Sequence, residues 1–164
     1  MCLIRKEGYN FGIVKDNPIE AYKVLIERDG DLISPVRAFR YRMGKTYYEE
    51  MLGTIGDYSI DGFPVYEQGF HMLSTIEGAN QYLNKIKWFV EWQNDFIKQI
   101  CNTKCDFLVI VKCVIPPSEY TLYSSGVDGD FGIQGIVSNR IKIVGIVSKT
   151  PRQNGRNATN LKPF

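Results

Sequence analysis

Residues 106–115 read DFLVIVKCVI, and only Asp106 and Lys112 in this run are polar. A short run of mostly β-branched and apolar residues with so few polar positions predicts a strand that is buried on both faces. Pro116 and Pro117 follow at once and end the strand, because proline has no amide hydrogen for a sheet ladder. We therefore place this strand at the centre of a sheet.

Strand signals also precede and follow this run. Residues 22–27 (YKVLIE) alternate, and Asp29-Gly30 is typical of a tight turn, so the segment predicts one arm of a hairpin. The second arm is expected at 36–43 (VRAFRYRM), closed by Gly44-Lys45, and residues 46–52 fit either a continuation of the sheet or a short helix. Further short strands are expected at 66–73, 119–124 and 140–147, and loops at 53–68 and 126–132.

One segment has the pattern of a long helix. Ser74-Thr75-Ile76-Glu77 fits a capping box, in which Ser74 is the N-cap and Glu77 bonds back to it. Apolar residues then recur at helical spacing, which predicts a helix over about 75–100 with one buried face. Gly78 lies in the first turn, where glycine disfavours helix, and marks close approach to a neighbouring element.

The overall composition suits one soluble domain. The chain has 164 residues, 44% of them hydrophobic and 23% charged. From Lys149 to Lys162 there are four basic residues and no acidic ones, which predicts a disordered basic tail over 149–164. The sequence therefore predicts a single α+β domain over 1–148, with a mostly antiparallel sheet packed on one long helix.

Charge and hydropathy narrow the location and the partners. Twenty basic residues against 18 acidic ones give a net charge of +2, which argues against a dedicated nucleic-acid-binding protein with a basic stripe. No apolar run approaches the ~18 residues of a membrane-spanning helix, and the N-terminus lacks the apolar stretch of a signal peptide. We expect a cytoplasmic protein without a membrane partner. The sequence leaves homo-oligomerisation open.

The scarcity of histidine excludes several enzyme classes. His71 is the single histidine of the chain, so two-histidine phosphoesterases and HExxH zinc proteases are excluded within one chain. Cys101, Cys105 and Cys113 could form a Cys3His zinc site with His71, but they lack CxxC knuckles. We therefore expect reduced thiols that fill small core positions, with Cys113 buried in a strand, and no metal and no cofactor. Cys2 would become an N-terminal nucleophile if Met1 were removed, and this alternative stays open.

Cationic and aromatic residues suggest a pocket for an anion. In the strand at 36–43, Arg37 shares a face with Phe39, Tyr41 and Met43, and a guanidinium beside rings suits an anionic planar ligand such as a nucleotide. His71 and Ser74 lie just before a helix N-terminus, which favours anions. The alternative for His71 is a histidine hydrogen-bonded inside the fold, and it stays open. Asp128 and Asp130 in a glycine-rich loop fit a turn better than a calcium site. The predicted ligand-binding residues are Arg37, Tyr41, Lys45, His71, Ser74 and Tyr120, with no catalytic set.

The stretch from Gly69-Phe70-His71 through Ser74 and Ala79 to Tyr82 resembles the second motif of ADP-ribosyltransferase-like folds. In that family an early strand supplies an arginine or histidine and a late strand or loop supplies a catalytic glutamate. The resemblance implies an enzyme that acts on NAD through Arg37, Ser74, Tyr82 and Glu119.

Most of the chain is similar to small proteins of bacteria and their phages. The shared features are Met1-Cys2-Leu3, Tyr22 to Leu25, Ser34-Pro35, Gly44-Lys45, Gly69 to His71 and Val114-Ile115-Pro116. This resemblance implies an anti-defence role, for instance a sponge that sequesters a nucleotide immune signal in the host cytoplasm. Non-catalytic nucleotide binding is our leading hypothesis, the transferase is the second, and an inhibitor that binds a host protein is the third.

Overall fold

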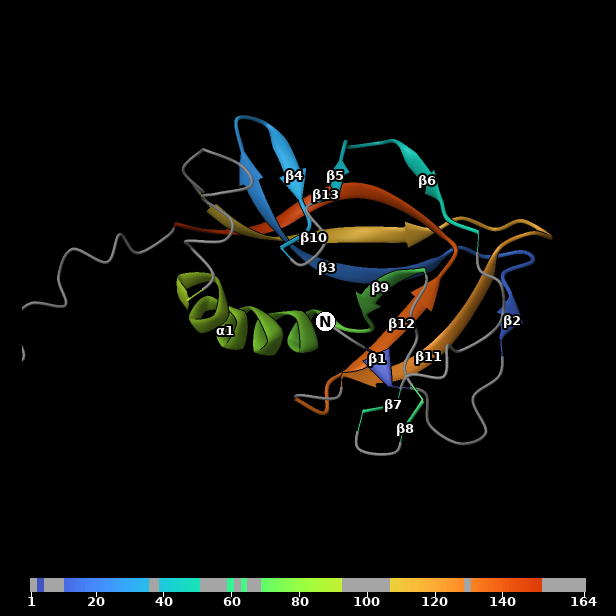
Figure 1. The fold of residues 1–164 in the computed structure, drawn as a ribbon. Helices are drawn as coiled ribbons and strands as arrows, with labels where there is room; N and C mark the ends of the chain where they lie inside the picture. Colours follow the sequence, from blue (N-terminus) through green and yellow to red (C-terminus); the bar gives the residue numbers. More distant parts are fainter. Residues whose placement is uncertain are drawn as a thin grey trace, which may run out of the picture.

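The computed structural model describes residues 3–4, 11–35, 39–50, 59–60, 63–64, 69–92, 107–128 and 131–151. These residues form one 11-stranded sheet, a separate two-stranded pair and one α-helix (Figure 1). All of their strand pairs are antiparallel. The prediction of a single α+β domain with a mostly antiparallel sheet is therefore confirmed.

The central strand of the sheet is β10 (Phe107–Ile115), as its apolar run predicts. It pairs with β3 (Ile19–Arg28) on one side and with β13 (Arg140–Pro151) on the other. The main path of the sheet is β1-β11-β12-β9-β3-β10-β13-β6, with β2 beside β11 and β4 between β3 and β5. The remaining strands are β1 (Leu3–Ile4), β2 (Gly12–Ile13), β4 (Asp31–Ile33), β5 (Arg40–Tyr41), β6 (Thr46–Tyr48), β7 (Ser59–Ile60), β8 (Phe63–Pro64), β9 (Phe70–Leu73), β11 (Leu122–Asp128) and β12 (Gln134–Ser138).

The predicted turn at Asp29-Gly30 is confirmed, but the hairpin partner is not the one expected. Both turn residues have positive φ, 47° and 82°, and β3 returns directly into β4. The expected second arm at 36–43 contributes only the short strand β5, and residues 36–38 lie outside the described residues. The tight turn fixes the register, so the residues immediately after it pair first.

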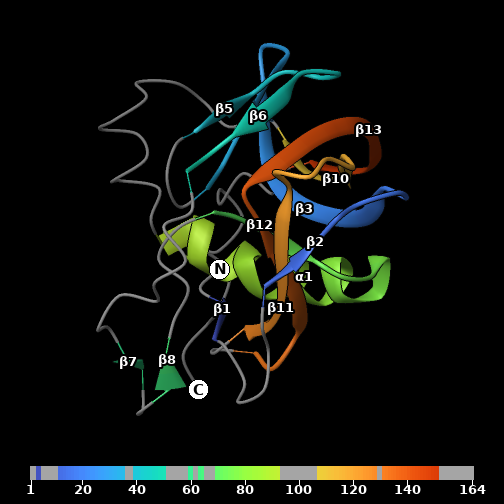
Figure 2. The ribbon, with the colours of Figure 1, turned by 90° about the vertical axis from the view of Figure 1, so that its right-hand side faces the viewer.

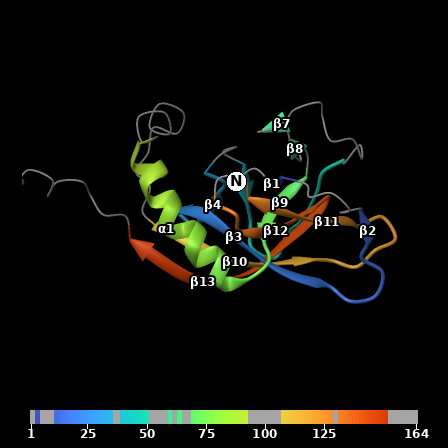
Figure 3. The same ribbon diagram turned by 90° about the horizontal axis from the view of Figure 1, so that it is seen from below.

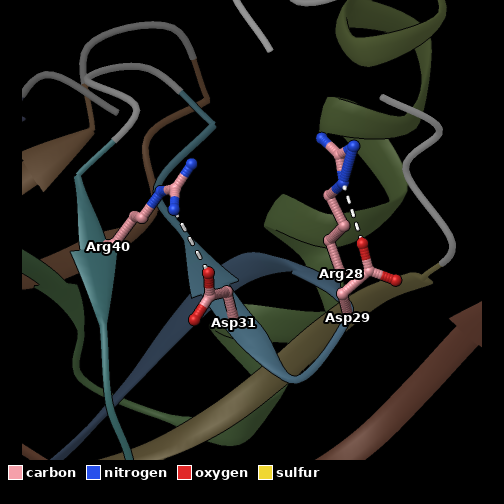
Figure 4. A network of polar contacts seen from close by, with 4 residues as sticks. All are labelled: Arg28, Asp29, Asp31 and Arg40. Carbon is pink, nitrogen blue, oxygen red and sulfur yellow. Dashed lines mark hydrogen bonds and ion pairs between the residues drawn. The ribbon is translucent and has the colours of Figure 1, made fainter. Parts of the chain in front are cut away.

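Ion pairs accompany this hairpin on both sides of its turn (Figure 4). Arg40 on β5 lies 3.4 Å from Asp31 on β4, and Arg28 lies 3.7 Å from Asp29. The Arg40–Asp31 pair is exposed, so it contributes little to stability. It does tie β5 to β4 close to the aromatic residues described below.

The helix α1 (Ile76–Trp92) lies across one face of β3 and β10 (Figure 3). Residues 93–100 of the predicted helix lie outside the described residues. The face that α1 buries on this side of the sheet packs as one core with residues of β3, β9 and β10. Its members include Ala79, Tyr82, Leu83 and Ile86 of the helix, and Val24, Ile26, Leu73, Leu108 and Ile110 of the strands.

The start of α1 differs from the predicted capping box. The N-cap is Thr75, whose Oγ1 accepts a hydrogen bond of 3.0 Å from the amide of Gly78, so the assignment of Ser74 as N-cap is wrong. The Ser74 amide instead donates to the carbonyl of Gln134 on β12, at 3.2 Å. The predicted close approach at Gly78 is confirmed, because a Cβ there would lie 3.0 Å from Ile133 Cγ2.

The opposite face of the sheet forms a second core, which the strands themselves enclose. The sheet curves, so that β4, β5 and β6 rise at one end while β9, β12, β11 and β1 bend away at the other (Figures 1 and 2). We call this side the inner face. Its buried residues include Ala21, Leu25, Leu32, Tyr41, Phe70, Met72, Val109, Val111, Cys113, Ile141 and Ile143.

Several boundaries in the C-terminal half differ from the prediction. Glu119 and Tyr120 form a turn rather than a strand, and β11 begins at Leu122 and extends into the expected glycine-rich loop. The strand β12 was not predicted. Lys149, Thr150 and Pro151 continue β13 rather than begin the tail, and residues 152–164 lie outside the described residues.

Within the described part of the chain, no helix combines the length and the apolar character that crossing a membrane requires.

Candidate ligand site

Four aromatic rings meet where β5, β6 and β9 approach one another. The Tyr41 ring is buried, and its centroid lies 4.8 Å from Phe39, 5.3 Å from Tyr47 and 6.3 Å from Phe70. Phe39 also contacts Tyr47 at 5.4 Å and Phe70 at 6.2 Å. All five contacts are edge-to-face, an arrangement that aromatic pairs favour. We call Phe39, Tyr41, Tyr47 and Phe70 the ring cluster.

Lys23 contacts the ring cluster from within the fold. It lies on β3 between Ala21 and Leu25, two buried residues of the inner face, and is itself half-buried. Its Nζ donates to the carbonyl oxygen of His71 at 2.5 Å and lies 5.9 Å from the centroid of the Tyr41 ring. A cation over a tyrosine ring gains from the negative face of the ring, and more so where water is displaced.

A second lysine contacts the ring cluster from the surface. Lys45 follows Gly44, which adopts a positive φ of 76° in the turn before β6, and its Nζ lies 5.2 Å from the centroid of Tyr47. The Tyr47 hydroxyl accepts a hydrogen bond of 2.7 Å from the amide of Arg42, which fixes the ring in place. Phe39 presents part of its ring at the surface, with 42% of the residue exposed.

His71 is held inside the fold rather than presented at the surface. Its Nδ1 accepts a hydrogen bond of 3.4 Å from the amide of Leu3, its carbonyl accepts one from Lys23, and the residue is buried. The histidine thus joins β1 to β9 through its ring and β9 to β3 through its backbone. A buried imidazole with these contacts positions the strands around the ring cluster.

Cys113 lies on the inner face of β10 and is fully buried. Burial raises the pKa of its thiol to about 12, and the nearby Lys23 ammonium opposes that shift. The thiolate, which is the nucleophilic form, is therefore suppressed at neutral pH. The prediction that this cysteine fills a core position is confirmed.

The predicted ligand-binding residues do not all gather at one place. Tyr41 belongs to the ring cluster and Lys45 contacts it, and the backbone of His71 adjoins it through Lys23. Ser74 and Tyr120 lie at opposite ends of β12. The Ser74 amide donates to the carbonyl of Gln134, the first residue of β12. The Tyr120 carbonyl accepts from the side-chain amide of Asn139, just past the last residue of β12. Arg37 lies outside the described residues.

The residues implied by the transferase resemblance are also apart. Tyr82 is buried against the sheet beneath α1, with its ring 6.0 Å from Phe131, near the start of β12. Glu119 is exposed in the turn before β11. Because β11 and β12 are antiparallel, this turn lies at the opposite end of the β11–β12 pair from the start of β12. The geometry of the described residues therefore does not bring this set together.

The remaining candidates from the sequence are the two aspartates of the glycine-rich loop and the cysteines. Asp128 caps the turn between β11 and β12, where its Oδ1 accepts a 3.0 Å bond from the Phe131 amide, as a turn residue does. Within the described ranges, no three histidine, cysteine or acidic residues gather in a way that could hold a metal ion. Cys2, Cys101, Cys105 and Asp130 lie outside the described residues.

Sequence reasoning missed Lys23 and Tyr47 as members of this site. Lys23 was part of a correctly predicted strand, and the available signal was that it shares a face with Ala21 and Leu25. Tyr47 carries no such signal, because the segment after Gly44 fits either a strand or a short helix.

The chain matches no protein-family model, no curated protein and no solved structure.

Proposed function

We propose that this protein is a non-catalytic binding protein for a small anionic ligand with a planar ring, such as a nucleotide. One observation carries the proposal: two lysines contact a single cluster of four rings, Lys23 from the inner face and Lys45 from the surface. Rings offer a stacking surface for a base, and an ammonium group attracts phosphate. Tyr41 and Lys45 of the predicted set fit this arrangement, whereas His71 meets it only through its backbone carbonyl, which accepts from Lys23.

The chemistry of the site supports binding more than turnover. The ring cluster lies beside two lysine ammonium groups. Among the described residues, the Cys113 thiol belongs to the same buried core as Tyr41 and Phe70, and burial raises its pKa to about 12. A nucleophile suppressed in this way does not attack at neutral pH. We propose that Phe39 stacks on the base, that Lys45 contacts the phosphate, and that Lys23 and Tyr41 form the floor. The similarity to phage proteins extends the proposal to the sequestration of a nucleotide immune signal.

The test is a thermal shift assay against NAD, ADP-ribose, cyclic mono- and dinucleotides and cyclic ADP-ribose isomers. A ligand at about a hundred times its dissociation constant adds ~2.7 kcal/mol, which raises the Tm by several degrees in a domain of this size. We expect such a shift from at least one nucleotide, with the nucleotide recovered unchanged. Nicotinamide release from NAD would favour the transferase instead.

Matched variants locate the site. Phe39→Ala and Lys45→Ala should weaken binding about tenfold each, roughly the loss of one charge-assisted or stacking contact. Phe131 and Lys85 form a similar exposed pair elsewhere, with the Lys85 ammonium 4.3 Å from the ring centroid, so Phe131→Ala and Lys85→Ala are controls that should bind normally. Equal binding by all four variants would refute the ring cluster as the site, and no shift with any nucleotide would refute the function.

A further inference from the structure

Helix α1 covers one end of the outer face, by which we mean the face of the sheet opposite the inner face (Figure 3). Beneath the helix, the side chains that β3 and β10 direct to this face are apolar and buried, namely Val24, Ile26, Leu108 and Ile110. Toward the start of β3 and the end of β10, the same alternation places polar and aromatic residues on the outer face. The uncovered end of this face therefore differs in chemistry from a core.

The uncovered end is formed by four adjacent strands, in the order β3-β10-β13-β6. Ala21, Cys113, Ile141 and Tyr47 of these strands pack on the inner face, so the residues next to them in sequence point to the outer face. The register agrees, because directly opposite residues share a face and Lys112 lies opposite Tyr22. These outward residues include Glu20 and Tyr22 of β3, Lys112 of β10, Arg140 and Lys142 of β13, and Tyr48 of β6, and we call these six the outer patch.

The outer patch presents rings and uncompensated cations to solvent, and none of its six residues is buried. Tyr48 is 60% exposed, and the Arg140 guanidinium carbon lies 5.4 Å from the centroid of its ring. Glu20 is the one acidic residue of the six, and it pairs with Lys112 at 2.5 Å. No carboxylate of the described residues pairs with Arg140 or Lys142. Two positive charges therefore remain on this surface.

A single-stranded nucleic acid matches both the rings and the cations. Its phosphates attract cations along the whole strand, and its unpaired bases stack on aromatic side chains. Tyr22 and Tyr48 lie on the outermost of the four strands, three inter-strand spacings or about 14 Å apart across the sheet, with the cations between them. An acidic peptide would satisfy the cations but would leave the rings without a planar partner. The combination favours a nucleic acid strand that crosses the sheet.

We propose that the outer patch binds single-stranded nucleic acid, with bases stacked on Tyr48 and Tyr22 and with phosphates at Arg140, Lys142 and Lys112. The low net charge of the whole chain does not oppose this, since attraction to phosphate depends on where the charges lie. The outer patch and the ring cluster lie on opposite faces of the sheet, because Tyr47 and Tyr48 are neighbours on β6. This inference therefore does not depend on the proposed small-ligand site.

The probes are fluorescein-labelled oligothymidine and oligouridine of about ten nucleotides, titrated with the full chain by fluorescence anisotropy. We expect saturable binding of at least one probe, and the preference between them assigns the sugar. Each phosphate contact to a single strand contributes about −0.7 to the slope of log K against log salt concentration, so three cations predict a slope of about −2. A duplex of the same length should bind at least about tenfold more weakly, because its bases cannot reach the rings.

Two variants separate stacking from charge. Tyr48→Ala should weaken binding about tenfold and leave the salt slope unchanged, whereas Lys142→Ala should reduce the magnitude of the slope by about 0.7. Both side chains point away from the core, so both variants should keep the Tm of the parent. Phe131→Ala and Lys85→Ala remove members of the other exposed cation–ring pair and are the matched controls that should bind like the parent.

Several results would overturn the proposal. These are the failure of both probes to bind, a duplex that binds as well as a single strand, and binding by Tyr48→Ala and Lys142→Ala that matches the controls. Loss of oligonucleotide binding in Phe39→Ala would place the strand on the ring cluster instead. Displacement of the probe by polyglutamate as readily as by unlabelled oligothymidine would assign the outer patch to an acidic protein segment.

Discussion

The buried thiol of Cys113 predicts a specific loss of stability in alkali. Its pKa is raised from an ordinary value of 9.0 to about 12 because the side chain lies in the apolar inner core, which penalises the charged thiolate. The folded protein therefore keeps its proton at pH values where the unfolded chain has lost it. Stability from this group is fully present below about pH 9 and is lost as the pH rises towards 12.

The size of the effect depends mainly on the unfolded chain. At about pH 10.5 the unfolded thiol is almost fully ionised and the folded one is almost fully protonated, so the free energy of unfolding falls by ~2 kcal/mol relative to about pH 8. This loss of about 2 kcal/mol depends little on the folded pKa, because the folded thiol stays protonated at about pH 10.5 whenever its pKa lies well above that pH. The magnitude is thus set by the ordinary ionisation of a cysteine.

The assay is urea unfolding of the parent and of Cys113→Ala at both pH values. The cavity left by the substitution lowers stability by the same amount at each pH, and the lysines and tyrosines that also titrate are common to both proteins. The parent should lose about 2 kcal/mol more than Cys113→Ala between the two conditions. Losses that agree within about 0.5 kcal/mol would refute a thiol that stays protonated in the core.

Three further substitutions test contacts that hold the sheet and helix around the site. Gly135→Ala should cost about 1–3 kcal/mol or more, since its Cβ would lie 2.6 Å from a backbone carbonyl of β9; a loss under ~0.5 kcal/mol in urea unfolding would contradict this close contact. Thr75→Ala should cost ~1 kcal/mol and Ser74→Ala much less, and the reverse order in thermal melts would restore the predicted capping box. Asn139→Ala removes two bonds of 2.9 Å to the segment that enters β11 and should cost about 1–3 kcal/mol, whereas Asn80→Ala at an exposed helical position is the control that should stay near the parent.

The parts of the fold that were predicted correctly have strong local signals. β10 is an apolar run closed by two prolines, β3 alternates and ends in Asp29-Gly30, and α1 has helical spacing of apolar residues. In contrast, β12 (Gln134–Ser138) contains a glycine and two polar residues and has little intrinsic strand preference. It forms a strand because β9 and β11 pair with it on both sides, and no local pattern reports such partners.

The position of Lys23 shows why only part of the candidate site could be predicted from the sequence. Alternation along β3 places the Lys23 side chain on the other face of the strand from Tyr22 and Val24. It does not reveal that the curved sheet encloses the face on which Lys23 lies. Two strands share the edge of β3 that does not face β10. The strand β9 pairs with it at Tyr22, and β4 pairs with it only from Ile26 onward. Where the two strands diverge, the His71 carbonyl accepts a hydrogen bond from the Lys23 ammonium.

The divergence of β9 and β4 also explains the ring cluster. Tyr41 reaches this place through β4 and β5, whereas Phe70 reaches it through β9, so their contact depends on both strands sharing one edge of β3. The same edge therefore sets the position of the lysine and of the rings that it contacts. A cation and an aromatic surface built by one non-local feature of the sheet form a single unit, and this is why we propose this unit as the ligand site rather than the helix N-terminus beside Ser74.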